Sequence, residues 1–181
     1  KNGLSVLFVS ESPILAELIE RSETEPNLTV LSYDKLNRRG NAEAFDVLYV
    51  DEGQDLLSLQ IFDEISPKLI GGLENGAWRW FMDPNHQSKL RGYFDPEALK
   101  VLRSGFNQKP FTQKLKNNVR NTKQIINFAE KSTGASLGKA KVELTADDPV
   151  LIKTSSKDLV SEVKRIIKSY VDKNVEYEDI G

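Results

Sequence analysis

The chain has 181 residues, 39% of them hydrophobic and 29% charged, with a formal net charge of -2, a composition that fits one large globular domain or one domain and part of another. It contains no cysteine and a single histidine, which excludes a disulfide framework and leaves no residue set typical of a zinc site. No apolar run approaches a membrane span and no signal peptide is visible, so we expect a cytoplasmic protein that does not engage a membrane.

Strand and helix signals alternate along the first part of the chain. Ser12 is predicted to cap a helix that has Pro13 in its first turn, because serine favours the N-cap and proline the first helical position. Gly105 is expected to end a later helix. The other elements predicted here are strands at residues 4–9, 28–31, 46–50 and 78–82, and helices at residues 57–65 and 95–103.

The rest of the chain continues the alternation. Thr122 is predicted to cap a helix that Gly134 ends, and apolar residues at helical spacing predict a long amphipathic helix at residues 157–173. Residues 111–115 are expected to be extended, and residues 150–154 to form a strand. Strands that alternate with helices predict an α/β fold with a parallel sheet flanked by helices.

One segment carries the strongest chemical signal. Residues 45–55 read Phe-Asp-Val-Leu-Tyr-Val-Asp-Glu-Gly-Gln-Asp, an apolar strand followed at once by two adjacent carboxylates. Ligands of open α/β sheets bind beyond the carboxyl ends of strands. Asp51 and Glu52 would therefore lie where nucleotide hydrolases hold Mg²⁺ with one acid and deprotonate the attacking water with another. The alternative interpretation is an acidic turn after a core strand.

Four segments resemble, in the family's order, motifs of UvrD/Rep-like superfamily 1 DNA helicases. Asp51-Glu52-Gly53-Gln54-Asp55 resembles the Asp-Glu-x-Gln-Asp box of motif II. Residues 78–87 are similar to motif III, in which a strand ends in Gly-Asp-x-x-Gln. Residues 115–125 are similar to motif IV, with its Asn-Tyr-Arg core, and residues 6–20 to motif Ia.

This resemblance implies a RecA-like P-loop NTPase fold and the start of a second RecA-like domain. Residues 1–114 would form the first domain, 1A, and residues 115–181 the N-terminal part of the second, 2A. The implied function is that of an ATP-dependent DNA helicase or translocase, in which a Mg²⁺-dependent ATPase site between the two domains drives movement along single-stranded DNA.

No phosphate-binding loop of the form Gly-x-x-x-x-Gly-Lys-Ser/Thr occurs in the sequence. Residues 134–140, Gly-Ala-Ser-Leu-Gly-Lys-Ala, are one residue short of it and lack the final hydroxyl, so we interpret them as a helix stop and a loop. In the family this loop lies just before motif Ia. We therefore expect the chain to be a fragment that acts with the rest of the same polypeptide and hydrolyses ATP poorly by itself.

The resemblance gives roles to single residues of the nucleotide site. Asp51 would hold Mg²⁺ and Glu52 would be the general base, while Gln54 and Asp55 would couple the site to neighbouring motifs. Arg120 would contact the γ-phosphate of ATP from the second domain, because a planar guanidinium suits phosphate oxygens. The resemblance thus implies that the acidic pair faces Arg120 across a gap the size of a terminal phosphate.

Three further residues belong to the expected nucleotide site. Asp83 is the motif III aspartate, and Asn118 is expected to brace the turn before Arg120. Gln87 falls one position later than the family's γ-phosphate sensor, with His86 in the usual place, so either residue, or neither, would serve as the sensor.

Contacts to single-stranded DNA are expected from two places. Ser10 lies in motif Ia, and Tyr93 and Phe94 lie with Arg91 in the loop after motif III, where an aromatic ring would stack on a base and the guanidinium would meet a phosphate. Glu11 departs from this pattern because it would repel a phosphate. Trp78, Trp80 and Phe81 alternate within a predicted strand, and core packing is expected for at least two of them.

Other departures keep a second interpretation open. Met82 replaces the usual glycine of motif III, and Val119 replaces the tyrosine that stacks on adenine in relatives. The alternative is a helicase-like module that binds nucleic acid or protein and has lost nucleotide turnover. A metal-dependent nuclease ranks third, because Glu162-Val163-Lys164 mimics a nuclease Glu-x-Lys but lies within an amphipathic helix.

Overall fold

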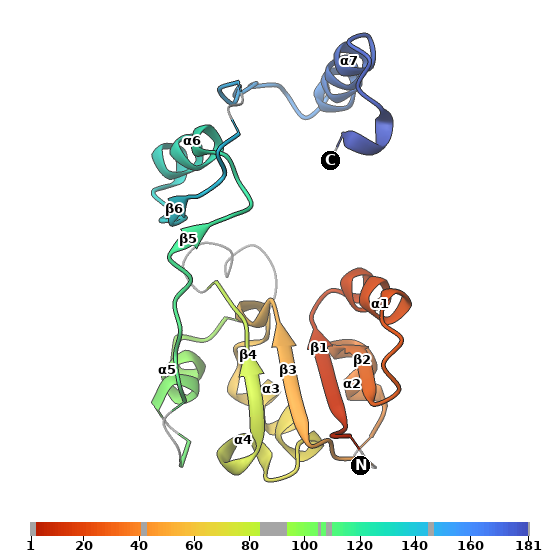
Figure 1. The fold of residues 1–181 in the computed structure, drawn as a ribbon, viewed down its shortest axis with the longest axis vertical. Coiled ribbons are helices and arrows are strands. Elements are labelled where there is room, and N and C mark those ends of the chain that lie inside the picture. Colours follow the sequence, from red (N-terminus) through yellow and green to blue (C-terminus); the bar gives the residue numbers. More distant parts are fainter. Residues whose placement is uncertain are drawn as a thin grey trace. The chain divides into compact units, whose positions relative to one another are not determined.

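The computed structural model describes residues 3–40, 43–83, 94–104, 106–107, 110–144 and 147–180. The chain divides into two units, Lys1–Leu115 and Lys116–Gly181, and each is described by itself (Figure 1). The division lies beside the domain boundary expected from the sequence. The assignment of the units as domains 1A and 2A stays a prediction.

A parallel sheet of four strands forms the centre of the first unit (Figure 1). The strand order is β2-β1-β3-β4, and every neighbouring pair is parallel. The strands are β1 (Val6–Ser10), β2 (Leu28–Ser32), β3 (Val47–Asp51) and β4 (Ala77–Trp80). The predicted α/β class with a parallel sheet flanked by helices is therefore confirmed.

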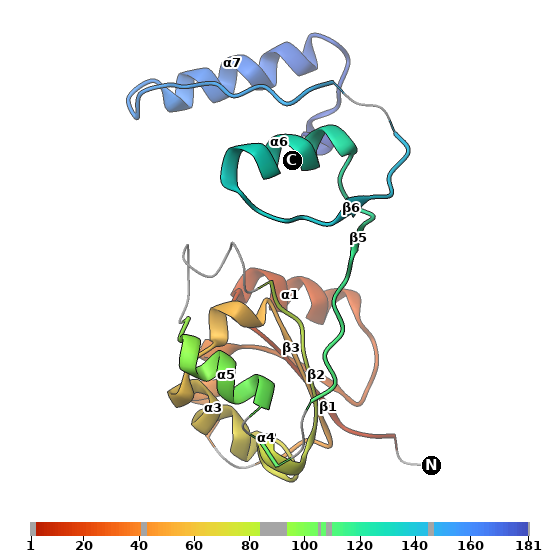
Figure 2. The same cartoon turned by 90° about the vertical axis from the view of Figure 1, so that its left-hand side faces the viewer.

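Helices cover both faces of this sheet (Figure 2). On one face, α2 (Tyr33–Arg38), α3 (Leu59–Ile65), α4 (Gly72–Asn75) and α5 (Pro96–Ser104) supply side chains to a single buried cluster. On the other face, α1 (Pro13–Ser22) packs against β1 and β2, with Ala16 buried. Short 3-10 helices, η1 (Gly53–Leu56) and η2 (Ser66–Lys68), flank α3.

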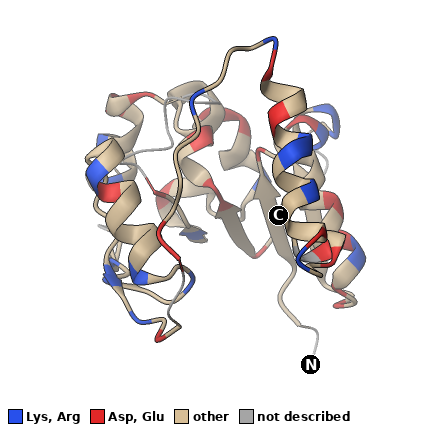
Figure 3. Ribbon diagram, turned by 90° about the horizontal axis from the view of Figure 1, so that it is seen from above, with Lys and Arg blue, Asp and Glu red and all other residues tan. Residues whose placement is uncertain are grey.

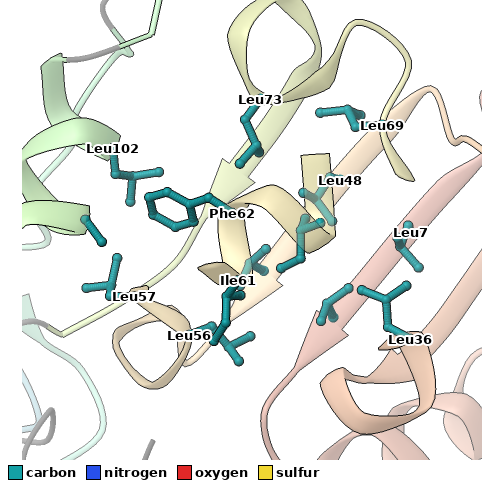
Figure 4. Close-up of a cluster of buried hydrophobic side chains, with 14 of the residues drawn as sticks. Leu7, Leu36, Leu48, Leu56, Leu57, Ile61, Phe62, Leu69, Leu73 and Leu102 are labelled. Carbon is teal, nitrogen blue, oxygen red and sulfur yellow. The ribbon is translucent and has the colours of Figure 1, made fainter. Parts of the chain in front are cut away.

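The main core follows from side-chain alternation along the strands. Leu7 and Val9 of β1, with Leu48 and Val50 of β3, point to the face that carries α2 to α5, and all four side chains are at most 1% exposed. Leu56, Ile61 and Phe62, from the segment that follows β3, belong to the same buried cluster, in which Figure 4 labels Leu7 and Leu48 of the strands. Burial of an aliphatic side chain contributes about 1.5–3 kcal/mol, so this cluster fixes the strand that carries the acidic pair.

Capping residues set helix ends where the sequence predicted them. Ser12 is the N-cap of α1, its Oγ accepting from the backbone N–H of Leu15 at 3.3 Å, and Pro13 is the first helical residue. Helix α2 was not predicted. It begins after Ser32, whose Oγ accepts from the backbone N–H of Lys35 at 3.4 Å.

The second unit contains a small strand-helix-strand motif. Strand β5 (Asn117–Asn118) pairs in parallel with β6 (Lys139–Ala140), and α6 (Lys123–Thr133) connects them. Thr122 caps α6 and Gly134 ends it in the left-handed region, at a φ of 72°, as predicted. Helix α7 (Leu159–Val171) also lies within its predicted range, and η3 (Tyr177–Asp179) follows it.

Two expectations for the second half of the chain are wrong. Residues 150–154 form no strand, and Val150 and Leu151 are 81% and 68% exposed. A strand needs a hydrogen-bonded neighbour. Within the described part of the chain, β5 pairs with β6 and not with residues 150–154. Residues 134–140 are more than a helix stop and a loop, because Lys139 and Ala140 form β6. The expected helix end at Gly105 lies outside the described residues.

No helix in the described ranges combines the length and apolar character that crossing a bilayer requires.

Candidate functional site

The strand order creates a switch point between β1 and β3. The chain leaves β1 toward β2 on one side, and it leaves β3 toward β4 on the other. Ligands of open α/β sheets bind outside the carboxyl ends of the strands at such a point. Ser10 and Asp51 are register partners there, as the last residues of their strands.

The acidic pair lies at this edge of the sheet. Asp51 is half-buried, and within the described part of the chain its carboxylate makes no hydrogen bond or ion pair. Glu52 is exposed and adopts a left-handed backbone, with φ 50° and ψ 38°. This conformation costs a non-glycine residue on the order of 1–3 kcal/mol and occurs often at functional sites. The left-handed turn thus begins directly after the end of β3.

A buried glutamine ties Glu52 to the neighbouring strand. Gln54 is 1% exposed; its Nε2 donates to Oε2 of Glu52 at 2.6 Å, and its Oε1 accepts from the backbone N–H of Asp83 at 3.0 Å. Asp83 follows β4, so one amide links the ends of β3 and β4. Gln54 therefore connects Glu52 with the segment that follows β4, and its role in coupling a nucleotide site to other motifs stays a prediction.

The turn after Glu52 is held by further contacts from β4 and its extension. The backbone N–H of Gly53 donates to the carbonyl oxygen of Phe81 at 2.8 Å, and Nε1 of Trp80 donates to the carbonyl oxygen of Gly53 at 3.0 Å. Core packing, the role expected for at least two of Trp78, Trp80 and Phe81, does not include this contact of Trp80 with Gly53. The signal that could have indicated it is the glycine inside an otherwise polar motif. Asp55 lies half-buried in η1, and its backbone N–H donates to the carbonyl oxygen of Glu52.

Ser10 does not fit the expected DNA contact. Its side chain is 0% exposed, and its Oγ accepts from the backbone N–H of Ser12 at 3.3 Å. Ser10 therefore stabilises the turn between β1 and α1 and offers no surface to a nucleic acid strand. The interpretation of this residue as a DNA contact is wrong because packing beside Asp51 buries it.

The residues that resemble motif IV lie in the second unit. Arg120 is exposed and follows β5. Oδ1 of Asn118 accepts from the backbone N–H groups of Arg120 and Asn121, at 3.1 and 2.9 Å, so Asn118 fixes the turn that presents Arg120. Val119 is 76% exposed. The approach of Arg120 to the acidic pair stays a prediction, because each unit is described by itself.

Several expected residues, His86, Gln87, Arg91 and Tyr93, lie outside the described residues. Their assigned roles as γ-phosphate sensor and DNA contacts stay predictions. At least two of Trp78, Trp80 and Phe81 were expected in the core. Trp78 and Trp80 do pack partly buried against the main cluster, as does Phe94, whereas Phe81 is 52% exposed.

The carboxylates at this edge suit a Mg²⁺ ion that is also held by the phosphate oxygens of a nucleotide. In the described part of the chain, no three His, Cys, Asp or Glu side chains are grouped to hold a metal ion. Mg²⁺ in phosphate-transfer sites keeps several waters and takes one or two carboxylates together with phosphate oxygens. Asp51, half-buried and with its carboxylate available, meets that smaller requirement.

The first unit has two cavities whose lining does not include the acidic pair. One of about 200 Å³ is lined by Tyr33, Asp63 and Glu64, and the other, of about 260 Å³, by Arg39 and Glu43; Lys68 lines both. The hydroxyl of Tyr33 donates to Glu64, which lowers the pKa of that carboxyl. Neither cavity includes Asp51 or Glu52. We place the candidate site at the switch point, because ligands of open α/β sheets bind at the carboxyl ends of the strands and the acidic pair lies there.

Charges of both signs are interspersed along the helices (Figure 3). Arg21 pairs with Glu17 on α1 and Arg165 with Glu162 on α7, each at 2.5 Å. Glu162, proposed above as part of a nuclease-like triplet, thus pairs with Arg165, and this contact lowers the pKa of the carboxyl.

Comparison of the chain with protein-family models, with curated proteins and with solved structures gave no match.

Proposed function

We propose that this chain carries motifs Ia, II, III and IV of an ATP-dependent DNA helicase or translocase of the UvrD/Rep-like superfamily 1. One observation carries the proposal. Glu52, in a left-handed turn at the switch point of a parallel sheet, is joined by the buried amide of Gln54 to the backbone of Asp83. A simple acidic turn after a core strand would not need a buried polar link to the next strand.

The two acids have different tasks in this proposal. Asp51 would hold Mg²⁺ of the nucleotide, and the bound ion would neutralise charge on the phosphates during transfer. Glu52 accepts the proton of the attacking water, and Gln54 orients its carboxylate by donating to Oε2. Arg120, on the turn that Asn118 fixes, contacts the γ-phosphate from the second domain. The proposed site also requires a phosphate-binding loop, which is not among these 181 residues.

The test is ATP hydrolysis by the intact gene product, with and without single-stranded DNA and with and without Mg²⁺. We expect turnover that requires Mg²⁺ and rises with single-stranded DNA. Asp51→Asn is expected to remove the Mg²⁺-dependent turnover. Equal turnover by the wild type and by Asp51→Asn would reject the proposal.

A second candidate function has one specific observation in its favour. Val119 is 76% exposed at the position where relatives stack an aromatic ring on adenine. The chain could then be a helicase-like binding module without nucleotide turnover. DNA binding by the intact gene product in the absence of any ATP hydrolysis would favour this candidate over the first.

A further inference from the structure

Glu52 needs a support for its unusual backbone, because a left-handed turn at a glutamate is not its preferred conformation. The described contacts that hold the following residue come from the β4 side of the sheet. Gly53 donates its N–H to Phe81 and accepts from Nε1 of Trp80. Both backbone groups of Gly53 are thus held, one residue after the expected general base.

Trp80 also explains why residue 53 is glycine. The φ of Gly53 is not positive, so its backbone does not require glycine. A Cβ atom built on Gly53 would overlap Nε1 and Cδ1 of Trp80 and would lie 2.9 Å from its Cε2. The indole therefore rests directly on the backbone of the turn.

The core also holds the indole of Trp80 in place. The ring of Phe62, on α3, meets that of Trp80 edge to face, with centroids 5.3 Å apart and an interplanar angle of 81°. Trp80 is also the register partner of Val50, the residue before Asp51. The ring is held by the core on one side and touches the turn on the other.

We propose that Trp80 is a positioning residue for Glu52, and that its indole locks the left-handed turn by donating to Gly53 and by occupying the space of a side chain at position 53. This inference rests on the proposed role of Glu52 as general base. A simply structural Trp80 would affect stability alone, whereas a positioning Trp80 affects the orientation of the Glu52 carboxylate and hence the chemical step.

The experiment compares Trp80→Phe with Trp78→Phe, a matched control on the same strand. Nε1 of Trp78 donates to the carbonyl oxygen of Leu73 at 3.0 Å, away from the acidic pair. Each variant loses one indole-to-carbonyl hydrogen bond and part of an indole ring. Urea midpoints of the two variants are measured first, so that an effect on kcat can be distinguished from a loss of folding stability.

The readouts are the backbone amide exchange and chemical shifts of residues 51–55 in the chain, and kcat and KM for ATP in the intact gene product. Trp80→Phe is expected to perturb these amides and to lower kcat by on the order of tenfold to a hundredfold with KM little changed. Trp78→Phe is expected to leave the amides of residues 51–55 and kcat near wild type. Equal amide shifts and equal kcat in the two variants would overturn the inference.

Gly53→Ala approaches the same contact from the other side. Gly53→Ala is expected to lower kcat as Trp80→Phe does. The fold-loss of kcat in the double variant is expected to be smaller than the product of the two single fold-losses, because both changes disrupt the same contact between Trp80 and Gly53. Fully multiplicative effects would overturn the inference. If the wild-type gene product shows no ATP hydrolysis, the proposed function fails, and the amide data still decide whether Trp80 holds the turn.

Discussion

Ser10 and Asp51 end adjacent parallel strands as register partners, one fully buried and the other half-buried. The pairing places Asp51 at the point where the chain turns away from β1 and β3 in opposite directions. It also gives Ser10 a structural task, since its Oγ accepts from the backbone of Ser12 at the start of α1. The position of the acidic pair therefore depends on the sheet and not on the motif alone.

Glu52→Gln in the intact gene product is expected to reduce ATP hydrolysis by about 10²-fold or more while nucleotide binding is retained, because an amide cannot accept the proton of water. Steady-state turnover and a fluorescent nucleotide titration measure the two effects. The control is Glu74→Gln, an exposed carboxylate-to-amide change in α4, which precedes β4. Turnover of Glu52→Gln equal to that of the control contradicts the general-base assignment.

Gln54→Ala is expected to destabilise the first unit by about 1–3 kcal/mol, because the backbone N–H of Asp83 loses its acceptor in a part-buried hydrogen bond and a small cavity opens at the buried Gln54 side chain. Urea unfolding measures the change. Gln60→Ala is the matched control, since Nε2 of Gln60 also donates to a glutamate, Glu64, but on the exposed side of α3. We expect a change within about 0.5 kcal/mol there. A similar cost for both glutamines would argue against the buried link.

Ser5→Ala should make stability less dependent on pH in the acid range. The Oγ–H and backbone N–H of Ser5 donate to Oδ2 of Asp46, at 2.7 and 2.8 Å, and lower the pKa of that carboxyl. Stability from a lowered carboxyl pKa is fully present above the unfolded-state pKa, about 3.9, and is lost as pH falls through the folded-state value.

Urea midpoints at pH 7 and at pH 3 test this expectation. The midpoint of Ser5→Ala is expected to lie below that of the wild type at pH 7, and the difference is expected to shrink toward pH 3. Asp46→Asn, which cannot titrate, should show the same reduced pH dependence. A difference that stays constant between the two pH values would exclude this linkage.

Ser12→Ala is expected to destabilise the first unit by about 1 kcal/mol, because the backbone N–H of Leu15 loses its N-cap acceptor. Ser22→Ala, at the other end of α1, removes a hydroxyl that donates to the carbonyl oxygen of Ile19 and is exposed. Its expected cost is smaller, and urea unfolding of both variants compares them. An equal cost would mean that Ser12 does not act as a cap.

Elements with strong local signals were predictable from the sequence. Ser12 with Pro13 correctly predicted the start of α1, and Thr122 with Gly134 correctly predicted both ends of α6. These residues act on the backbone within one helical turn, so no distant part of the chain is needed to interpret them. Strand β3 was likewise predictable, because its short apolar run must be buried between helices.

Elements that depend on distant partners were not predictable in the same way. Residues 150–154 have a strand-like composition but form no strand in the described structure. Helix α2 is short and was missed, although Ser32 caps it. Apolar composition indicates that a segment can enter a sheet, whereas a neighbouring strand must supply the hydrogen bonds.

The sequence by itself determined that an apolar strand ends in Asp51 and Glu52 and that strands alternate with helices, because both are properties of contiguous residues. Only the tertiary structure decided that β1 and β3 are neighbours, that Ser10 is buried, and that Gln54 and Trp80 hold the turn at Glu52. These relations join residues up to 41 positions apart, as in the pair of Ser5 and Asp46. They arise from packing in three dimensions, which local patterns do not encode.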